Sequence, residues 1–225
     1  MLYESIALVA TLIASSTDQI ILVIPPNYTS TSAMLYFYVK KENKWNQTKE
    51  TNAFIGYNGS GKEKEGDGKT PVGVYKFNCY FGIEDNPGTK LPYIKVNNSH
   101  YWDSDPESKR YNTLVNNETY KDFDISKSEH IIDVKPGYEY AINIDYNKDR
   151  TKYKGSGIFL HCFTKNLFTA GCVSINITEL KDIYGKINEN CHIIIDTKEN
   201  MTKYYSASNF IKSGIFMFMC FILLF

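Results

Sequence analysis

The chain has 225 residues, enough for one sizeable core, and no Pro-, Gly- or Ser-rich stretch divides it in two. Its 25 basic residues balance 25 acidic ones, and neither sign gathers into a run that would follow a phosphate backbone. We therefore expect one domain and no nucleic-acid partner.

The N-terminal segment, residues 1–16, carries an apolar run from Ile6 to Ala14 that ends in Ser15 and Ser16. An apolar run followed by small residues is typical of a signal peptide, cleaved here near Ser16. No Lys or Arg precedes the run, so a buried first strand is the alternative. We take the mature domain to begin at residue 17.

Short β-branched and aromatic runs separated by turn residues recur along the rest of the chain and predict a mainly β fold. The one long stretch without such a run, residues 103–127, is either a flap over a substrate site or an excursion of the chain. The expected strands are residues 19–24, 33–39, 53–57, 72–77, 93–96, 138–146, 157–161 and 192–196.

Two glycine-rich stretches between residues 56 and 70 do not have the spacing of a phosphate-binding loop, so we interpret them as turns. The four histidines do not fall at metal-ligand spacing. A zinc site made of His161, Cys162 and Cys172 is the less favoured alternative. We expect neither a metal nor an organic cofactor.

The segment from residue 155 to residue 175 carries the strongest chemical signal. A predicted strand ends at His161, and Cys172 follows after a short loop and a turn that contains Gly171. An imidazole beside a thiol can convert it to the nucleophilic thiolate. Gly171 allows a sharp bend that brings neighbouring amides toward an oxyanion. The alternative is a pair of ordinary buried cysteines beside a core histidine.

One helix is predicted, at residues 177–187, directly after this motif. Apolar residues recur there at helical spacing, and Asn176 with Glu179 forms a possible capping box.

The C-terminal segment, residues 206–225, combines small residues, a short polar spacer and an apolar run from Ile215 to Phe225. The run is shorter than the roughly 20 residues that span a bilayer. The pattern favours a signal for attachment of a glycosylphosphatidylinositol (GPI) anchor. A tail-embedded anchor and a buried final strand are the alternatives. Membrane contact would then occur only through this C-terminal anchor.

Sequons of the form Asn-x-Ser/Thr favour passage through a glycosylating secretory pathway. We expect a secreted or cell-surface glycoprotein. The sequons lie at Asn27, Asn46, Asn58, Asn97, Asn117, Asn176 and Asn200.

Several of these segments together resemble the L,D-transpeptidase catalytic domain family (YkuD), in its single-domain ErfK/YbiS/YcfS/YnhG-like branch. They are residues 55–59, the Thr-Pro-Val-Gly strand within 65–75, residues 102–106 and 111–112, and residues 146–147. His161, Thr169, Gly171 and Cys172 fill positions of the family's catalytic signature. Ala170 and Ser174 depart from it, because the signature has a second His and a following Arg there.

The resemblance implies a β-sandwich-like fold over residues 17–205, with the active site between sheets under a mobile flap. It also implies acyl transfer without a cofactor. Cys172 would attack a peptidoglycan stem peptide to form a thioester, which passes to an amine or to water, as a transpeptidase or a carboxypeptidase would do. His161 would be the base, oriented by the carbonyl of Cys162, with Thr169 and Gly171 supporting the motif.

Two other functions remain open at this point. One is a catalytically silent surface module that binds peptidoglycan or another glycan. The other is a structural glycoprotein for which the fold is only a scaffold.

Overall fold

A computed structural model describes residues 17–42 and 44–201. The predicted signal peptide, residues 1–16, and the predicted C-terminal anchor signal, residues 206–225, lie outside the described residues. Within the described part of the chain, no helix is long and apolar enough to cross a membrane.

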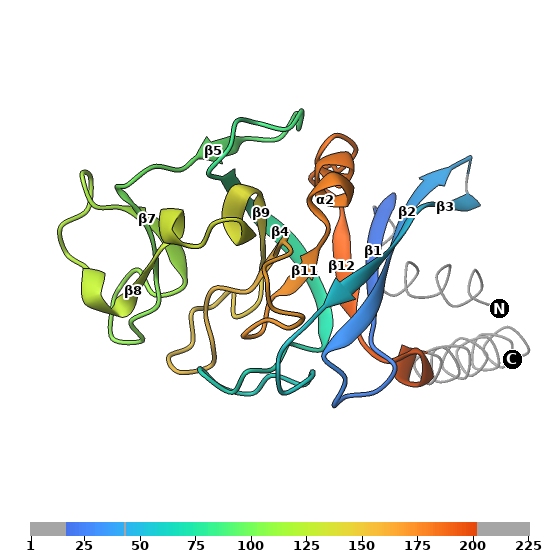
Figure 1. Ribbon diagram of the computed structural model, residues 1–225, viewed down its shortest axis with the longest axis horizontal. Helices are drawn as coiled ribbons and strands as arrows, with labels where there is room; N and C mark the ends of the chain where they lie inside the picture. The colour runs from blue at the N-terminus through green and yellow to red at the C-terminus, as the bar shows by residue number, and fades with distance from the viewer. Residues whose placement is uncertain (1–16, 43, 202–225) are drawn as a thin grey trace, which may run out of the picture.

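The main sheet is curled and closes on itself (Figure 1). Its strand order is β12-β1-β2-β3-β11-β10-β9-β4-β5, and β12 pairs with β4 as well as with β1. All of these strands except β5 therefore form a closed circuit. The strands are β1 (Gln19–Ile24), β2 (Ser32–Lys41), β3 (Lys44–Phe54), β4 (Gly73–Gly82), β5 (Tyr93–Lys95), β9 (Ala141–Ile144), β10 (Phe159–Cys162), β11 (Val173–Ile175) and β12 (His192–Ile195).

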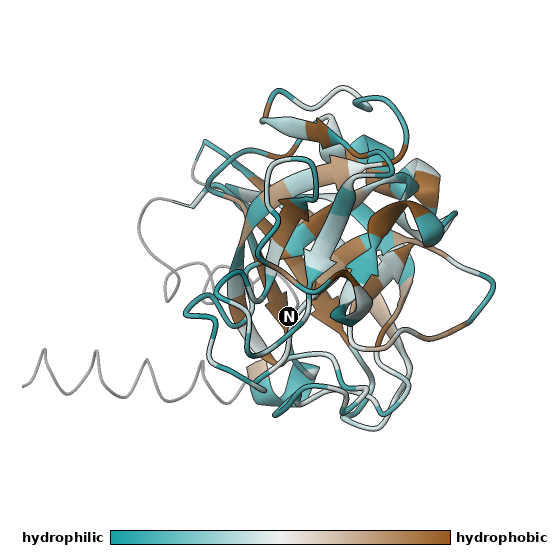
Figure 2. Ribbon diagram, turned by 90° about the vertical axis from the view of Figure 1, so that its left-hand side faces the viewer, coloured by the Kyte–Doolittle hydropathy of each residue, from teal (hydrophilic) through white to brown (hydrophobic). Residues whose placement is uncertain are grey.

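The main hydrophobic core lies inside this circuit. In Figure 2, brown hydrophobic residues recur along the central strands. The helix α2 (Ile177–Tyr184) adds Leu180, Ile183 and Tyr184, all fully buried, to the same core. The Oδ1 of Asn176 caps the helix by accepting the N–H of Thr178 at 2.8 Å. The predicted helix is confirmed, but it ends three residues early, because the chain leaves helical geometry after the Gly185 cap.

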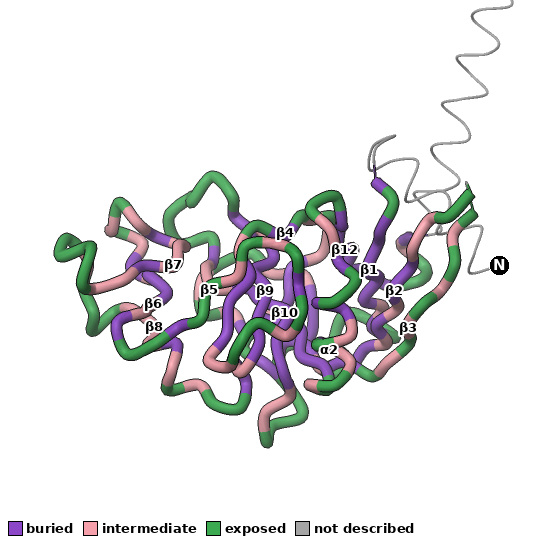
Figure 3. Tube along the Cα trace, turned by 90° about the horizontal axis from the view of Figure 1, so that it is seen from above, coloured by how far each residue is buried: buried purple, intermediate pink, exposed green. Residues whose placement is uncertain are grey.

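A second sheet of three strands, in the order β7-β6-β8, forms the opposite end of the molecule from β1–β3 (Figure 3). Its strands are β6 (His100–Asp103), β7 (Thr113–Asn116) and β8 (Ser128–His130), and the 3-10 turns η1 (Ile125–Lys127), η2 (Ile131–Asp133) and η3 (Gly137–Glu139) accompany it. We refer to residues 100–139 as the flap sheet region.

Several strand predictions differ from the structure. β4 continues to Gly82 rather than ending at residue 77, and β6, β8 and β11 were not predicted. β3 starts at Lys44 rather than at residue 53. The sequence pattern did not indicate its first part, because one face of this strand is exposed and polar. The segment 103–127 contains β7, which is held by pairing with β6 rather than by local propensity. The segment 138–146 begins in the turn η3, where the backbone N–H of Tyr138 donates to the carbonyl of Val134. Strand pairing in this segment begins only at Ala141, the first residue of β9.

A small apolar cluster joins the flap sheet region to the main sheet. Trp102 stacks on Phe81 and packs edge-on against Phe159, with ring centroids 6.3 and 4.7 Å apart. The side chain of Asn112 bridges the same two parts, since its Oδ1 accepts the indole N–H of Trp102 and the backbone N–H of Gly157. Cys172 belongs to this cluster rather than to the main core.

Candidate active site

The alternation of β10 decides which of its side chains face the flap sheet region. Leu160 and Cys162 point into the main core, so Phe159 and His161 point the other way. β10 runs parallel to β11, with His161 opposite Ser174. Cys172, just before β11, therefore lies beside the start of β10 on the same face as His161.

The thiol of Cys172 is held by backbone groups of the segment that leads into β10. Its Sγ donates to the carbonyl of Gly157 and accepts the N–H of Phe159, both at 3.3 Å. Burial raises the pKa of this thiol to about 12, although the Phe159 amide favours the thiolate. The free thiol is therefore protonated at neutral pH.

The imidazole of His161 has a fixed tautomer. Its Nδ1 lies 2.7 Å from the carbonyl oxygen of Cys162, and a carbonyl only accepts, so Nδ1 carries the proton. Nε2 is then an acceptor. Burial lowers the pKa of His161 to about 4, so the ring is neutral at pH 7. Among residues 17–42 and 44–201, no hydrogen bond joins this ring to the thiol of Cys172.

The turn before Cys172 is fixed by two threonine hydroxyls, which both donate to the carbonyl of Cys172. Thr169 does so at 2.7 Å and Thr70 at 3.2 Å. Gly171 has a φ of +143°, and a Cβ at this position would lie 2.9 Å from the carbonyl oxygen of Lys69. The N–H of Gly171 donates to the Oγ1 of Thr169 and supports the turn. Amide stabilisation of an oxyanion near Gly171 stays a prediction.

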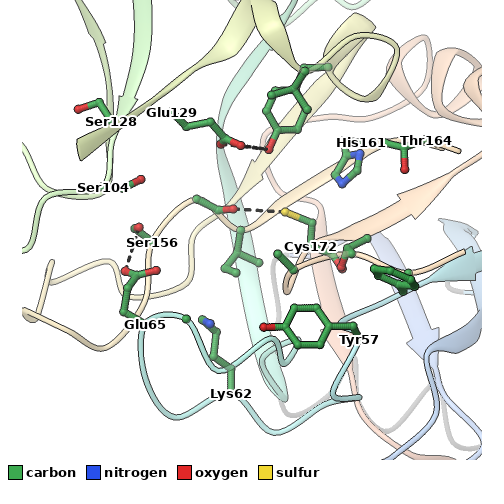
Figure 4. A pocket seen from close by; sticks show the side chains of 18 of the residues that line it. Tyr57, Lys62, Glu65, Ser104, Ser128, Glu129, Ser156, His161, Thr164 and Cys172 are labelled. Carbon is green, nitrogen blue, oxygen red and sulfur yellow. Dashed lines mark hydrogen bonds between the residues drawn. The ribbon is translucent and has the colours of Figure 1, made fainter. Parts of the chain in front are cut away.

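A cavity of about 680 Å³ opens over Cys172 and His161 (Figure 4). The flap sheet region forms one wall with Ser104, Glu129 and Tyr138, and the segment 57–66 forms another. Tyr57 and Phe168 line it as well, and both are more than 40% exposed, with their rings edge-on 6.2 Å apart. The cavity therefore has an apolar, aromatic rim.

Four charged side chains line this cavity. Lys62 pairs with Asp67 at 2.8 Å, and Lys127 pairs with Asp105 at 3.1 Å. Glu65 accepts hydrogen bonds from the hydroxyls of Tyr111 and Ser156. Glu129 accepts both of its hydrogen bonds from the hydroxyl of Tyr138, at 3.1 and 3.2 Å.

The structure brings all the predicted site residues to one place, but in different roles. Cys172, His161 and Thr169 line the cavity, whereas the side chain of Cys162 lies in the main core and Gly171 shapes the turn. The four cysteines in the described ranges are free thiols. Across those ranges, no three His, Cys, Asp or Glu side chains gather as a metal site.

Several cavity residues were not singled out as site residues from the sequence, and they come from distant segments. Lys62 and Glu65 precede β4, and Glu129 and Tyr138 lie in the flap sheet region. None of them has a diagnostic spacing from Cys172, so no local signal could have identified them.

A comparison with protein families finds a match to the L,D-transpeptidase catalytic domain (YkuD) over residues 20–195. The chain belongs to this family. The predicted family and the predicted mainly β fold are thereby confirmed. A search of curated proteins found no match.

Solved structures of bacterial proteins are also similar to this YkuD domain. Bd1075 of Bdellovibrio bacteriovorus is 19% identical, with 88% of this chain and 56% of that chain covered and a TM-score of 0.41. The helical cell shape determining protein Pgp2 of Campylobacter jejuni is 17% identical, with coverages of 84% and 54% and a TM-score of 0.42.

An L,D-transpeptidase (Yku) of Stackebrandtia nassauensis is 14% identical, with coverages of 84% and 64% and a TM-score of 0.33. The chain spans less than two thirds of the length of each of these three structures.

Proposed function

We propose that this YkuD domain is a secreted cysteine acyltransferase, in which Cys172 forms a thioester with a peptidoglycan stem peptide and passes the acyl group to an amine or water. One observation carries the proposal. A thiol and an imidazole that is protonated on Nδ1 line the same cavity, with His161 on β10 and Cys172 directly before the parallel strand β11. Their proximity is what nucleophilic catalysis by a cysteine requires.

Acylation would proceed through His161 as the proton carrier. The thiol of Cys172 leaves the carbonyl of Gly157 and gives its proton to Nε2 of His161, while the sulfur attacks the substrate carbonyl. The same proton then passes to the leaving amine as the C–N bond breaks. The hydrogen bond from Nδ1 to the carbonyl of Cys162 keeps the proton on Nδ1, which leaves Nε2 able to accept the proton of the thiol.

The charge of the site favours proton transfer over a preformed ion pair. Burial disfavours both the thiolate and the imidazolium, so the resting site holds a neutral thiol and a neutral imidazole. Substrate binding would turn the thiol toward His161. The Phe159 amide, 3.3 Å from Sγ, stabilises the thiolate as it forms.

Secretion is the part of the proposal that rests on the predicted signal peptide and the sequons. Five of the seven sequon asparagines are exposed and two are half-buried, so folding leaves room for glycans. Peptidoglycan lies outside the cytoplasm, which agrees with an exported enzyme. Attachment through residues 206–225 remains a proposal about a segment outside the described residues.

A silent binding module is the second candidate. It is favoured by one observation: the thiol is hydrogen-bonded to Gly157 and not to His161. In that case the cavity, with its rim of Tyr57 and Phe168, would hold a wall fragment without reacting.

Intact mass spectrometry distinguishes the two functions. The purified domain is incubated with a muropeptide tetrapeptide, and the acyl adduct and released D-alanine are measured for the wild type, for Cys172→Ala and for Cys79→Ala. We expect an adduct in the wild type and in Cys79→Ala, whose half-buried thiol does not line the cavity, and none in Cys172→Ala. An unmodified wild type that still binds the muropeptide would favour the binding module.

A further inference from the structure

The cavity over Cys172 has an uneven charge balance. Both lysines that line it are paired with carboxylates outside the lining, Asp67 and Asp105. Both glutamates that line it, Glu65 and Glu129, form no ion pair within residues 17–42 and 44–201 and accept hydrogen bonds only from hydroxyl groups. The cavity therefore offers negative charge to a ligand and no free cation.

Of the two glutamates, Glu129 is the one connected to the reacting groups. Both of its oxygens face the hydroxyl of Tyr138, and the ring of Tyr138 packs edge-on against His161 at 5.4 Å. Figure 4 shows Glu129 in the same cavity as Cys172, with its carboxylate directed to the hydroxyl of Tyr138 along a dashed line. Its charge also contributes to the raised pKa of that thiol, as a nearby anion does.

Glu129 is half-buried, and burial raises the pKa of its carboxyl. A desolvated carboxylate is stabilised by a cation with which it can pair. Tyr138 donates one O–H, whereas a carboxylate has about four lone-pair positions, so Glu129 retains capacity for an incoming N–H donor.

The two possible acyl acceptors differ in the protons that they must lose. Water loses one proton as it attacks the thioester. A primary amine arrives as an ammonium ion at neutral pH and must lose one proton before attack and a second one during it. His161 can take one of these two protons. A second proton-accepting group close to the amine nitrogen is suited to take the other.

We propose that Glu129 is the acceptor-binding residue of this enzyme: it holds the ammonium group of an amine acceptor beside the Cys172 thioester and takes its first proton. The inference rests on the proposed acyl transfer and deepens it, because it assigns the domain to aminolysis rather than hydrolysis. Its acceptor class is a primary amine that is charged in solution.

The proton balance closes in three steps. The ammonium gives one proton to Glu129 and becomes a neutral amine. The amine nitrogen forms the C–N bond with the thioester carbonyl, and its second proton passes to Nε2 of His161. The C–S bond then breaks, the Cys172 sulfur recovers the proton from His161, and Glu129 releases its proton to solvent.

The test compares Glu129→Gln with the wild type after acylation by the muropeptide tetrapeptide. Glycinamide, which is mostly an ammonium ion below its pKa, is the charged acceptor, and hydroxylamine, which arrives neutral, is the matched uncharged one. Product amide, hydroxamate and free acid are quantified by mass spectrometry. Glu118→Gln, which removes an exposed carboxylate outside the cavity, is the control variant.

We expect Glu129→Gln to lower the ratio of amide to acid about tenfold or more with glycinamide, the effect of losing one charged hydrogen bond. Hydroxamate formation should change by less than about threefold, since hydroxylamine has no first proton to lose. Glu129→Asp, which keeps the charge, should recover part of the glycinamide reaction. Glu118→Gln should match the wild type.

An unchanged ratio in Glu129→Gln, or an equal loss with both acceptors, would overturn the role of Glu129 while the acyl adduct still supports acyl transfer. If Glu129→Gln does not fold, Tyr138→Phe is tested instead, because this variant keeps the Glu129 carboxylate but removes the hydroxyl that orients it. An unchanged reaction of Tyr138→Phe with glycinamide would then overturn the inference. Absence of any adduct on wild-type Cys172 removes the proposed function, and the inference with it.

Discussion

At the scale of single residues, the resting state of Cys172 is defined by backbone atoms rather than by His161. The thiol lies between the Gly157 carbonyl and the Phe159 amide, and the imidazole is held by the Cys162 carbonyl. Both titrating groups are buried and neutral at pH 7. Reactivity should therefore follow the small fraction of thiolate present at each pH.

Alkylation of Cys172 by iodoacetamide tests this state. Because the thiol pKa is about 12, we expect the rate to rise about tenfold per pH unit from neutral pH upward, without a plateau below about pH 9. Peptide mapping separates Cys172 from Cys79, Cys162 and Cys191. A plateau near neutral pH that is lost in His161→Ala would instead indicate a thiolate paired with imidazolium.

At the scale of elements, the glycine-rich segment between β3 and β4 is an ordered loop built around Asp67. Its carboxylate accepts a hydrogen bond from the ammonium of Lys62 at 2.8 Å. It also accepts hydrogen bonds from the backbone N–H groups of Glu63, Lys64 and Lys69. Burial opposes ionisation of Asp67, but these hydrogen bonds outweigh it and hold the pKa at about 2. The interpretation of this segment as turns agrees with the structure, and the loop also delivers Lys62 and Glu65 to the cavity wall.

Asp67→Asn should lower the free energy of unfolding by about 2 kcal/mol at pH 7. The folded pKa lies below the ordinary value of 3.8, so the contribution of Asp67 is present above pH 3.8 and is lost as the pH falls toward 2. Urea titrations at several pH values should show the two proteins converging near pH 2. Asp85→Asn, at an exposed ion pair, should change stability little at any pH; a constant difference between Asp67→Asn and the wild type would contradict this account.

At the scale of the whole molecule, the cavity exists because the flap sheet region docks on the outer face of the closed sheet through Trp102, Phe81 and Phe159. The main core lies on the other side of β10 and β11. The sequon asparagines lie on the outer surface of this assembly, either exposed or half-buried.

Expression through a glycosylating secretory pathway should yield glycans at Asn27, Asn97 and Asn176. These three are exposed, and their side-chain oxygens rather than their nitrogens make the hydrogen bonds seen in the structure. Asn200, whose Nδ2 donates to Asp196, should be occupied less. Glycopeptide mapping with and without a deglycosylating amidase measures this. A secreted domain with none of these sites occupied would contradict the expectation.

The sequence by itself determined the mainly β class, the helix after the motif and the family, and it placed Cys172 and His161 in one short segment; their joint role in catalysis stays a prediction. Those features depend on local alternation, helical spacing and a short stretch of chain between two adjacent strands, so they can be read within a few dozen residues. The short strands β6, β7 and β8 were not predicted, because they are held by pairing with one another.

Only the tertiary structure decided which groups surround the thiol. Glu129, Tyr138, Lys62 and Glu65 reach the cavity from segments far from Cys172. Burial raises the pKa of both Glu129 and Tyr138, and that burial exists only in the folded chain. The physical reason is that hydrogen bonds and desolvation act between neighbours in space, whereas the sequence orders residues only along the chain.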